Sequence, residues 1–168
     1  MLVIGGGYTG LETQRFYACN VHASIDNIGE TVRDILDYFN VVYGKLDEAV
    51  YFELKVVINE LLSNAIKHGC KENEDKFVRV LAGIVDKEFA LLKVEDDGDG
   101  YDTTILEQYG KTGETVIKNV DDINEYGRGI FLVKNLCDEF KINRKGNKVV
   151  INKRLSKAKT GMKARKII

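Results

Sequence analysis

Three stretches of the chain carry apolar residues at the three- and four-residue spacing of an amphipathic helix. Residues 25–39 follow Ser24, whose residue type favours the position before a helix, so we expect the first helix there. Residues 46–68 form the longest stretch, and Gly69 is expected to end it. Residues 129–137 predict the third helix. The apolar stripe of the longest helix comprises Leu54, Val57, Ile58, Leu61, Leu62, Ala65 and Ile66.

Five other stretches are rich in the residue types that favour strands. The first covers residues 15–23. Residues 76–85 and 89–94 are separated by three polar residues, which predicts an antiparallel hairpin. Residues 139–143 and 148–153 flank a Lys-Gly-Asn turn and predict a second hairpin.

The order of these elements predicts an α+β fold, a two-layer α/β sandwich in which helices cover one face of a mixed sheet. We expect this domain to span residues 14–155, with a flexible lead-in at 1–13 and a basic flexible tail at 156–168. The segment 103–126 is polar and contains two glycines, so we expect a mobile loop there.

Composition narrows the functional classes. The 168 residues suffice for one domain, with 44% hydrophobic and 30% charged residues. No apolar run is long enough to cross a membrane. The three cysteines, Cys19, Cys70 and Cys137, form no metal-binding pattern and no even set, which favours a reducing cytoplasm.

Net charge is unevenly distributed along the chain. The total is −1, but residues 153–168 hold seven basic residues and no acid, so the remainder carries −8. An acidic body argues against direct nucleic-acid binding by the domain.

Chemistry is concentrated in three motifs, the first of which is Glu60-Leu-Leu-Ser-Asn64-Ala-Ile-Lys-His68-Gly69. Its carboxylate, amide and imidazole recur every four residues and lie on one edge of a helix. An amide oxygen suits Mg²⁺, and a carboxylate one turn earlier suits a general base. Taken alone, these residues also fit an ordinary solvated helix surface.

The second motif, Asp96-Asp-Gly98-Asp-Gly100, follows an apolar strand. A buried carboxylate at a strand end can accept a hydrogen bond from an adenine amino group, and glycine lets the backbone approach the base. The alternatives are a plain acidic turn and an EF-hand loop beginning at Glu95. The calcium alternative is weak, because Leu106 stands where that loop needs Glu.

The third motif, Gly127-Arg128-Gly129, opens the last predicted helix, where free backbone N–H groups can bind phosphate. A further glycine-rich segment at residues 5–10 fits the dinucleotide fingerprint. Because residues 15–23 predict a strand where that fingerprint needs a long helix, we do not expect a dinucleotide site there.

In this order and spacing, the three motifs resemble the N, G1 and G2 boxes of the GHKL ATPases, also called Bergerat-fold ATPases. Residues 14–155 resemble in particular the RsbW-type anti-sigma-factor serine/threonine kinases. The run from Gly127 to Glu139, with its following Gly146-Asn147 turn and closing strand, is the most specific match to that branch.

The resemblance implies roles for the motif residues. Glu60 would be the catalytic base, Asn64 would coordinate Mg²⁺, Asp96 would bind adenine, and 103–126 would form the ATP lid. The implied nucleotide-binding residues are Asn64, His68, Asp96, Gly98, Gly100, Gly127, Arg128, Gly129 and Ile130.

The resemblance also implies partners. Such proteins are usually homodimers that sequester a sigma factor and phosphorylate a Ser or Thr on a STAS-domain antagonist. Many members of the wider superfamily carry a Thr after the glycine of the last hairpin, where this chain has Asn147 and Lys148, so phosphate contacts from that hairpin are in doubt.

Two other functions remain open on sequence grounds. A nucleotide-binding partner-switch module without kinase activity would use the same residues. A histidine-kinase catalytic fragment would need a phospho-accepting His on a dimerisation helix, whereas the two histidines lie in a predicted strand (His22) and in the first motif (His68).

Overall fold

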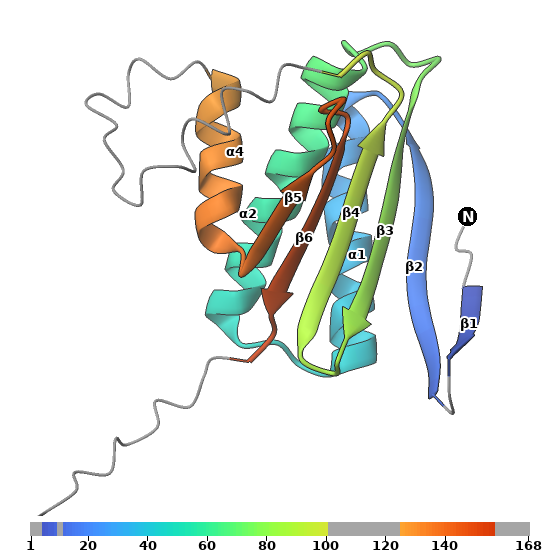
Figure 1. Cartoon of the computed structure of the whole chain (residues 1–168), viewed down its shortest axis with the longest axis vertical. Helices are drawn as coiled ribbons and strands as arrows, with labels where there is room; N and C mark the ends of the chain where they lie inside the picture. Colours follow the sequence, from blue (N-terminus) through green and yellow to red (C-terminus); the bar gives the residue numbers. More distant parts are fainter. Residues whose placement is uncertain (1–4, 10–11, 101–124, 157–168) are drawn as a thin grey trace, which may run out of the picture.

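The structure is a computed structural model that describes residues 5–9, 12–100 and 125–156. Within them, six strands form one sheet in the order β1-β2-β3-β4-β6-β5. Figure 1 shows the helices gathered on one face of this sheet, so the predicted two-layer α+β sandwich is confirmed.

All five strand pairings are antiparallel, so the expectation of a mixed sheet is wrong. The six strands are β1 (Gly5–Thr9), β2 (Glu12–His22), β3 (Phe77–Val85), β4 (Phe89–Asp96), β5 (Glu139–Ile142) and β6 (Lys148–Arg154). Both predicted hairpins form: β3 pairs with β4, and β5 pairs with β6. The sheet places β6 beside β4, which brings the turn between β5 and β6 next to the end of β4.

The chain start departs from the expected flexible lead-in. Residues Gly5–Thr9 form β1 and pair with the beginning of β2, which starts at Glu12 rather than at residue 15. A glycine-rich strand followed by another strand is not the strand–loop–helix unit of a dinucleotide site. Of the mobile loop expected at 103–126, residues 103–124 lie outside the described residues, and residues 125 and 126 instead begin helix α4 (Glu125–Leu136). Of the basic tail expected at 156–168, residues 157–168 also lie outside them.

The three long helices match the predicted positions with shifted ends. Helix α1 covers Ile28–Tyr43 after one turn of 3-10 helix, α2 covers Glu48–Asn64, and α4 covers Glu125–Leu136. Ser24 precedes the first turn as expected, but its side chain makes no capping hydrogen bond. The next helix, α2, does have a side-chain cap: Oδ1 of Asp47 accepts a hydrogen bond of 3.0 Å from the backbone N–H of Ala49.

The core lies between the two layers. Alternate residues of β4, from Ala90 to Asp96, are buried against the helices, while the residues between them are half-buried on the open face. The predicted stripe of α2 is buried throughout. Fully buried large side chains on both layers include Ile35, Phe39, Leu54, Ile58, Leu62, Leu92 and Ile151. Within the described residues, no helix is long and apolar enough to cross a membrane.

A buried lysine joins three elements of the fold. Lys153 of β6 is 8% exposed, and its ammonium donates to the carbonyl of Leu136 at the end of α4 (2.6 Å). The same ammonium forms an ion pair of 2.5 Å with Glu53 of α2. A cation at a helix C-terminus also complements the helix dipole, so this residue stabilises the packing of α4 against α2 and the sheet.

We predict that Lys153→Met lowers the free energy of unfolding by about 1–3 kcal/mol, because it leaves the Leu136 carbonyl and the Glu53 carboxylate without their donor. Urea denaturation measures this loss. Lys55→Met is the control, since Lys55 is exposed on α2 and its loss should change stability by less than about 0.5 kcal/mol. Equal stability of the two variants would contradict the prediction.

Candidate functional site

The end of α2 carries an unusual turn. After Asn64 the chain continues as a π-helix over Ala65–Gly69, in which the N–H of Cys70 donates to the carbonyl of Ala65 at 2.8 Å. A π-turn holds one residue more than an α-turn and often occurs at functional sites. Gly69 therefore lies inside this turn with a negative φ, rather than after the helix in the left-handed conformation that a glycine stop adopts.

Gly69 is required for a different reason, which is its contact with Asp96. A Cβ on Gly69 would overlap the Asp96 carboxyl group, and a Cβ on Gly98 would overlap the carbonyl oxygen of Gly69. Gly100 has a φ of +81°, and a Cβ there would overlap the carbonyl oxygen of Lys145. Because these glycines have no side chain, the backbone of the loop after β4 can pack directly against the end of the α2 segment and against the last hairpin.

The Asp96 carboxylate lies at the end of β4 and is nearly enclosed. The residue is 6% exposed, and its Oδ1 accepts a hydrogen bond of 2.8 Å from the N–H of Gly98. Burial raises the pKa of the Asp96 carboxyl, although the N–H of Gly98 acts in the opposite direction. A carboxylate that is costly to bury and lines a pocket is a functional-site candidate.

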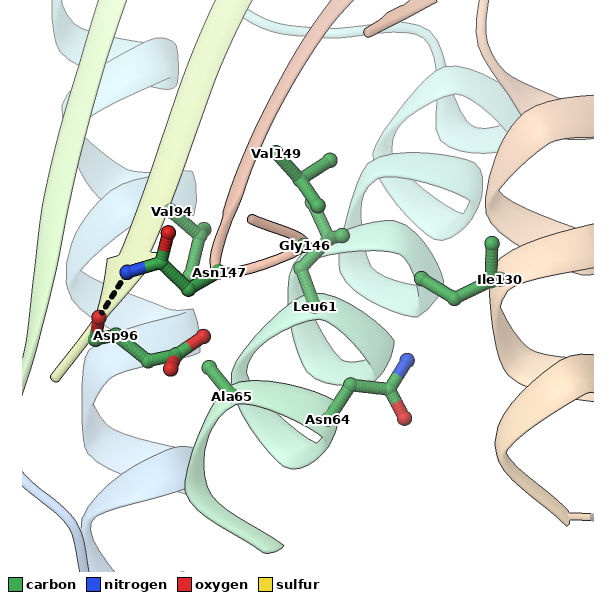
Figure 2. Close-up of a pocket in the computed structure, with 9 residues that line it drawn as sticks. All are labelled: Leu61, Asn64, Ala65, Val94, Asp96, Ile130, Gly146, Asn147 and Val149. Atoms are coloured by element: carbon green, nitrogen blue, oxygen red, sulfur yellow. Dashed lines mark hydrogen bonds between the residues drawn. The ribbon is translucent and has the colours of Figure 1, made fainter. Parts of the chain in front are cut away.

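The pocket beside Asp96 is small, with a cavity volume of about 20 Å³, and it opens to solvent. Its lining comes from α2, α4, β4 and the last hairpin: Leu61, Asn64, Ala65, Val94, Asp96, Ile130, Gly146, Asn147 and Val149. Figure 2 shows Asp96 and Asn64 on either side of Ala65, with Ile130 projecting from α4. Apolar side chains therefore separate two polar ends, as in many small-molecule sites.

The Asn64 end of the pocket lies beside the contact of α2 with α4 at Gly129. A Cβ on Gly129 would lie 2.5 Å from Oε2 of Glu60 and 3.4 Å from Nδ2 of Asn64. The absence of a side chain thus lets the helix backbone contact both groups. Glu60 and Asn64 are half-buried.

The Asn64 amide fits a ligand-binding role. Its Nδ2 is buried and has no hydrogen-bond partner among the described residues. An unsatisfied buried amide end costs about 1–3 kcal/mol, a cost that a hydrogen-bonding ligand at this position would offset. Turning the amide over would place its oxygen, a hard ligand suited to Mg²⁺, at the same position.

Comparison with known proteins identifies the family. The model of the histidine kinase-like ATPase domain family matches residues 23–153, which is most of the chain. The chain belongs to this family. Two structures of the Erythrobacter litoralis EL346 blue-light activated histidine kinase are also similar. They are 18% and 19% identical with TM-scores of 0.47 and 0.48, cover 76% and 77% of this chain, and are themselves covered over 61% and 42%.

Several curated relatives of this ATPase domain carry the name serine-protein kinase RsbW. The protein of Bacillus subtilis (strain 168) is 30% identical over 105 residues, which cover 62% of this chain and 64% of the relative. Those of Oceanobacillus iheyensis and Staphylococcus aureus (strain MSSA476) are both 28% identical, over 66% and 65% of this chain and over 69% and 65% of the relatives. The chain thus spans just under two thirds of the Bacillus and Staphylococcus relatives.

The ATPase domain brings together part of the expected residue set. Glu60 and Asn64 meet at Gly129, and Asn64 also lines the pocket that holds Asp96. Glu60 and Gly129 lie next to this pocket but are not among the residues that line it. His68 is exposed in the π-turn and does not line the pocket described above.

The third motif lies differently from its expected place. Helix α4 begins at Glu125, so Gly127-Arg128-Gly129 form part of its first turns instead of preceding it. Arg128 is exposed, whereas Gly129 and Ile130 are buried. The first four N–H groups of α4 have no partner within the helix, so this end of α4 retains the donors that a phosphate needs.

The acidic residues around Asp96 have structural partners of their own. Asp97 accepts hydrogen bonds from the N–H of Phe77 and from Arg79, and Glu95 pairs with Lys93 and Lys148. Within the described part of the chain, no group of three or more acidic, His or Cys residues is arranged to hold a metal ion. Residues 101–106 of the calcium-loop alternative lie outside the described residues.

Asn147 is the site residue whose position the sequence interpretation missed. Its Nδ2 donates to the carbonyl of Asp96 (2.8 Å), and its own carbonyl accepts from the N–H of Asp96 (3.0 Å). Asn at the first and Gly at the fourth position is a common β-turn pattern, and Asn143 and Gly146 fit it. That pattern predicts the turn, but only the pairing of β4 with β6 shows that the turn reaches Asp96.

We predict that Asp96→Asn melts at or above the wild-type temperature at pH 7. Because burial raises the pKa of Asp96 above its ordinary value of 3.8, the carboxyl's contribution to stability is complete below that value. It is lost as the pH rises through the folded-state pKa, so at pH 7 the ionised form destabilises the fold. The Asn amide oxygen can still accept from Gly98. The difference in stability should shrink as pH falls from 7 towards 4, and a lower melting temperature at pH 7 would disprove this account.

We also predict that Gly98→Ala lowers the free energy of unfolding by about 1–3 kcal/mol, since its methyl group would overlap the backbone of Gly69. Gly29→Ala in α1 is the matched control. No atom lies within 4 Å of a Cβ there, so that variant should gain up to about 1 kcal/mol from helix propensity. Chemical denaturation of both variants tests the difference, and similar stabilities would show that the close approach of Gly98 is not needed.

Proposed function

We propose that this chain is a Mg-ATP-dependent serine/threonine protein kinase of the anti-sigma type. It would phosphorylate a Ser or Thr on a STAS-domain antagonist and sequester a sigma factor. The observation that carries the proposal is the meeting of Glu60 and Asn64 at Gly129, next to a pocket that Asn64 lines together with the buried carboxylate of Asp96. The similarity to proteins named serine-protein kinase RsbW supports the choice of substrate class.

The two polar ends of the pocket suit the two ends of ATP. Asp96 would accept a hydrogen bond from the adenine amino group, with Gly98 and Gly100 shaping the adjacent backbone. Asn64 would coordinate Mg²⁺, which neutralises charge on the phosphates. The first turns of α4, including Gly127, Arg128, Gly129 and Ile130, would lie against the phosphates.

Glu60 would act as the general base. Its carboxylate would accept the proton of the incoming Ser or Thr hydroxyl while that oxygen attacks the γ-phosphorus and the bond to the β-phosphate oxygen breaks, leaving ADP. His68 is part of the same motif, and we propose for it a place at the rim of the nucleotide site. The segment 103–126 is the proposed ATP lid, and all of it before Glu125 lies outside the described residues.

The proposed partners follow from the family. We expect a homodimer that acts in the cytoplasm and contacts the sigma factor and the antagonist directly, without binding nucleic acid itself. The net charge of −8 over residues 1–152 supports this last expectation.

We predict that Asn64 and Glu60 separate binding from catalysis. Asn64→Ala should abolish Mg²⁺-dependent ATP binding in calorimetric titration. Glu60→Gln should keep ATP binding but lower phosphate transfer to a cognate antagonist by about 10²–10⁴-fold, the usual contribution of a general base. Asn59→Ala, an exposed neighbour on α2, is the control for both assays and should behave as wild type.

Two results would change the proposal. Unaltered phosphate transfer by Glu60→Gln would remove Glu60 from the mechanism. Saturable ATP binding by the wild type with no transfer to any antagonist would favour a nucleotide-binding partner-switch module instead of a kinase.

A further inference from the structure

Two asparagines of the last hairpin form a chain of hydrogen bonds that ends on Asp96. Asn143 Oδ1 accepts from the backbone N–H groups of Asn147 and Lys148, both at 3.1 Å. Asn143 Nδ2 donates to Oδ1 of Asn147 at 2.9 Å, and Asn147 Nδ2 donates to the carbonyl of Asp96 at 2.8 Å.

The direction of this chain is determined by the backbone. Because two N–H groups point at one end of the Asn143 amide, that end must be the oxygen. The Asn143 nitrogen must then face Asn147, so the Asn147 oxygen lies on that side and its nitrogen faces the Asp96 carbonyl. Neither amide can turn over without opposing two oxygens or two N–H groups.

Asp96 is consequently held from two sides. Its backbone is fixed by Asn147 through the N–H and the carbonyl, and its side chain is oriented by Gly98. Asn143 does not line the pocket, so it reaches the pocket through residues that do: Asn147 and Asp96 along the relay, and Gly146, whose N–H donates to the Asn143 carbonyl at 3.0 Å.

We propose that Asn143 and Asn147 are positioning residues whose amide relay fixes Asp96 and thereby the preference of the pocket for adenine over guanine. This inference rests on the proposed function, because it requires a purine nucleotide at Asp96. Adenine presents an amino donor to a carboxylate at the position where guanine presents a carbonyl oxygen, which a carboxylate repels. A carboxylate that is free to shift distinguishes the two bases less well, because it can move away from the guanine oxygen.

Asn143→Asp is the sharpest test. A carboxylate still accepts the two backbone N–H groups of the turn, but it cannot donate to Asn147. The Asn147 amide would then turn over and direct its oxygen at the Asp96 carbonyl. Asn147→Asp interrupts the relay at the next step, since it opposes an oxygen to the same carbonyl. Asn20→Asp, on an exposed residue of β2, controls for the added negative charge.

The measurement is the ratio of dissociation constants for Mg-GTP and Mg-ATP, obtained on the same preparation of each full-length protein. This ratio does not depend on the fraction of active protein, so partial unfolding cannot imitate the effect. Asn143→Asp should weaken ATP binding about tenfold and leave GTP binding nearly unchanged, so the ratio falls by about the same factor. Asn147→Asp should do likewise, and the double variant should lose no more than either single variant. Asn20→Asp should keep the wild-type ratio.

The outcomes separate the two claims. If the wild type prefers ATP and Asn143→Asp retains that preference, the relay is overturned and the proposed function stands. If the wild type binds neither nucleotide, or binds both equally, the proposed adenine site fails and the relay fails with it. If Asn143→Asp weakens the binding of Mg-ATP and Mg-GTP by the same factor, Asn143 only supports the structure of the hairpin, and the inference is also overturned.

Discussion

The contact between the Asp96 carboxylate and the backbone of Gly69 is the constraint on which the site depends. It requires a residue without a side chain on the helix and a buried acid on the strand, and it joins the two layers of the fold at one point. The π-turn brings Gly69 to that point, and the last hairpin holds the strand end from the other side. Several local features that look independent in the sequence therefore serve one contact.

Two acids lie near the proposed nucleotide site: Asp96 lines the pocket, and Glu60 lies beside the Asn64 end of it, next to Gly129. Under the proposed function, the arrangement separates the tasks. Asp96 is enclosed near the sheet, where a hydrogen bond from the adenine amino group would offset the cost of burying its carboxylate. Glu60 lies against α4, where the N–H groups of the helix and a bound cation would offset its negative charge. The apolar surface of Leu61 and Ala65 keeps the two environments apart.

Local pattern was sufficient for the helices and hairpins, because side-chain periodicity and turn residues encode them directly. The sheet was harder, since strand order is not a local property, and the antiparallel neighbours β4 and β6 are distant in sequence. The strand at Gly5–Thr9 was missed because glycine weakens every strand signal. Glu60, Asn64 and Asp96 were predictable from motif spacing, whereas Asn147 was not, because its importance comes from the neighbour that the sheet gives it.

The π-turn at Ala65–Gly69 also has a consequence for how this chain is aligned with others. It holds five residues where a regular helix ending at the same place would hold four, so a homologue without the bulge differs by a one-residue gap between Asn64 and Cys70. An alignment that passes through this point without the gap pairs Gly69 with a residue that faces elsewhere. Substitutions at this glycine can therefore be interpreted only after the turn type of each homologue is known.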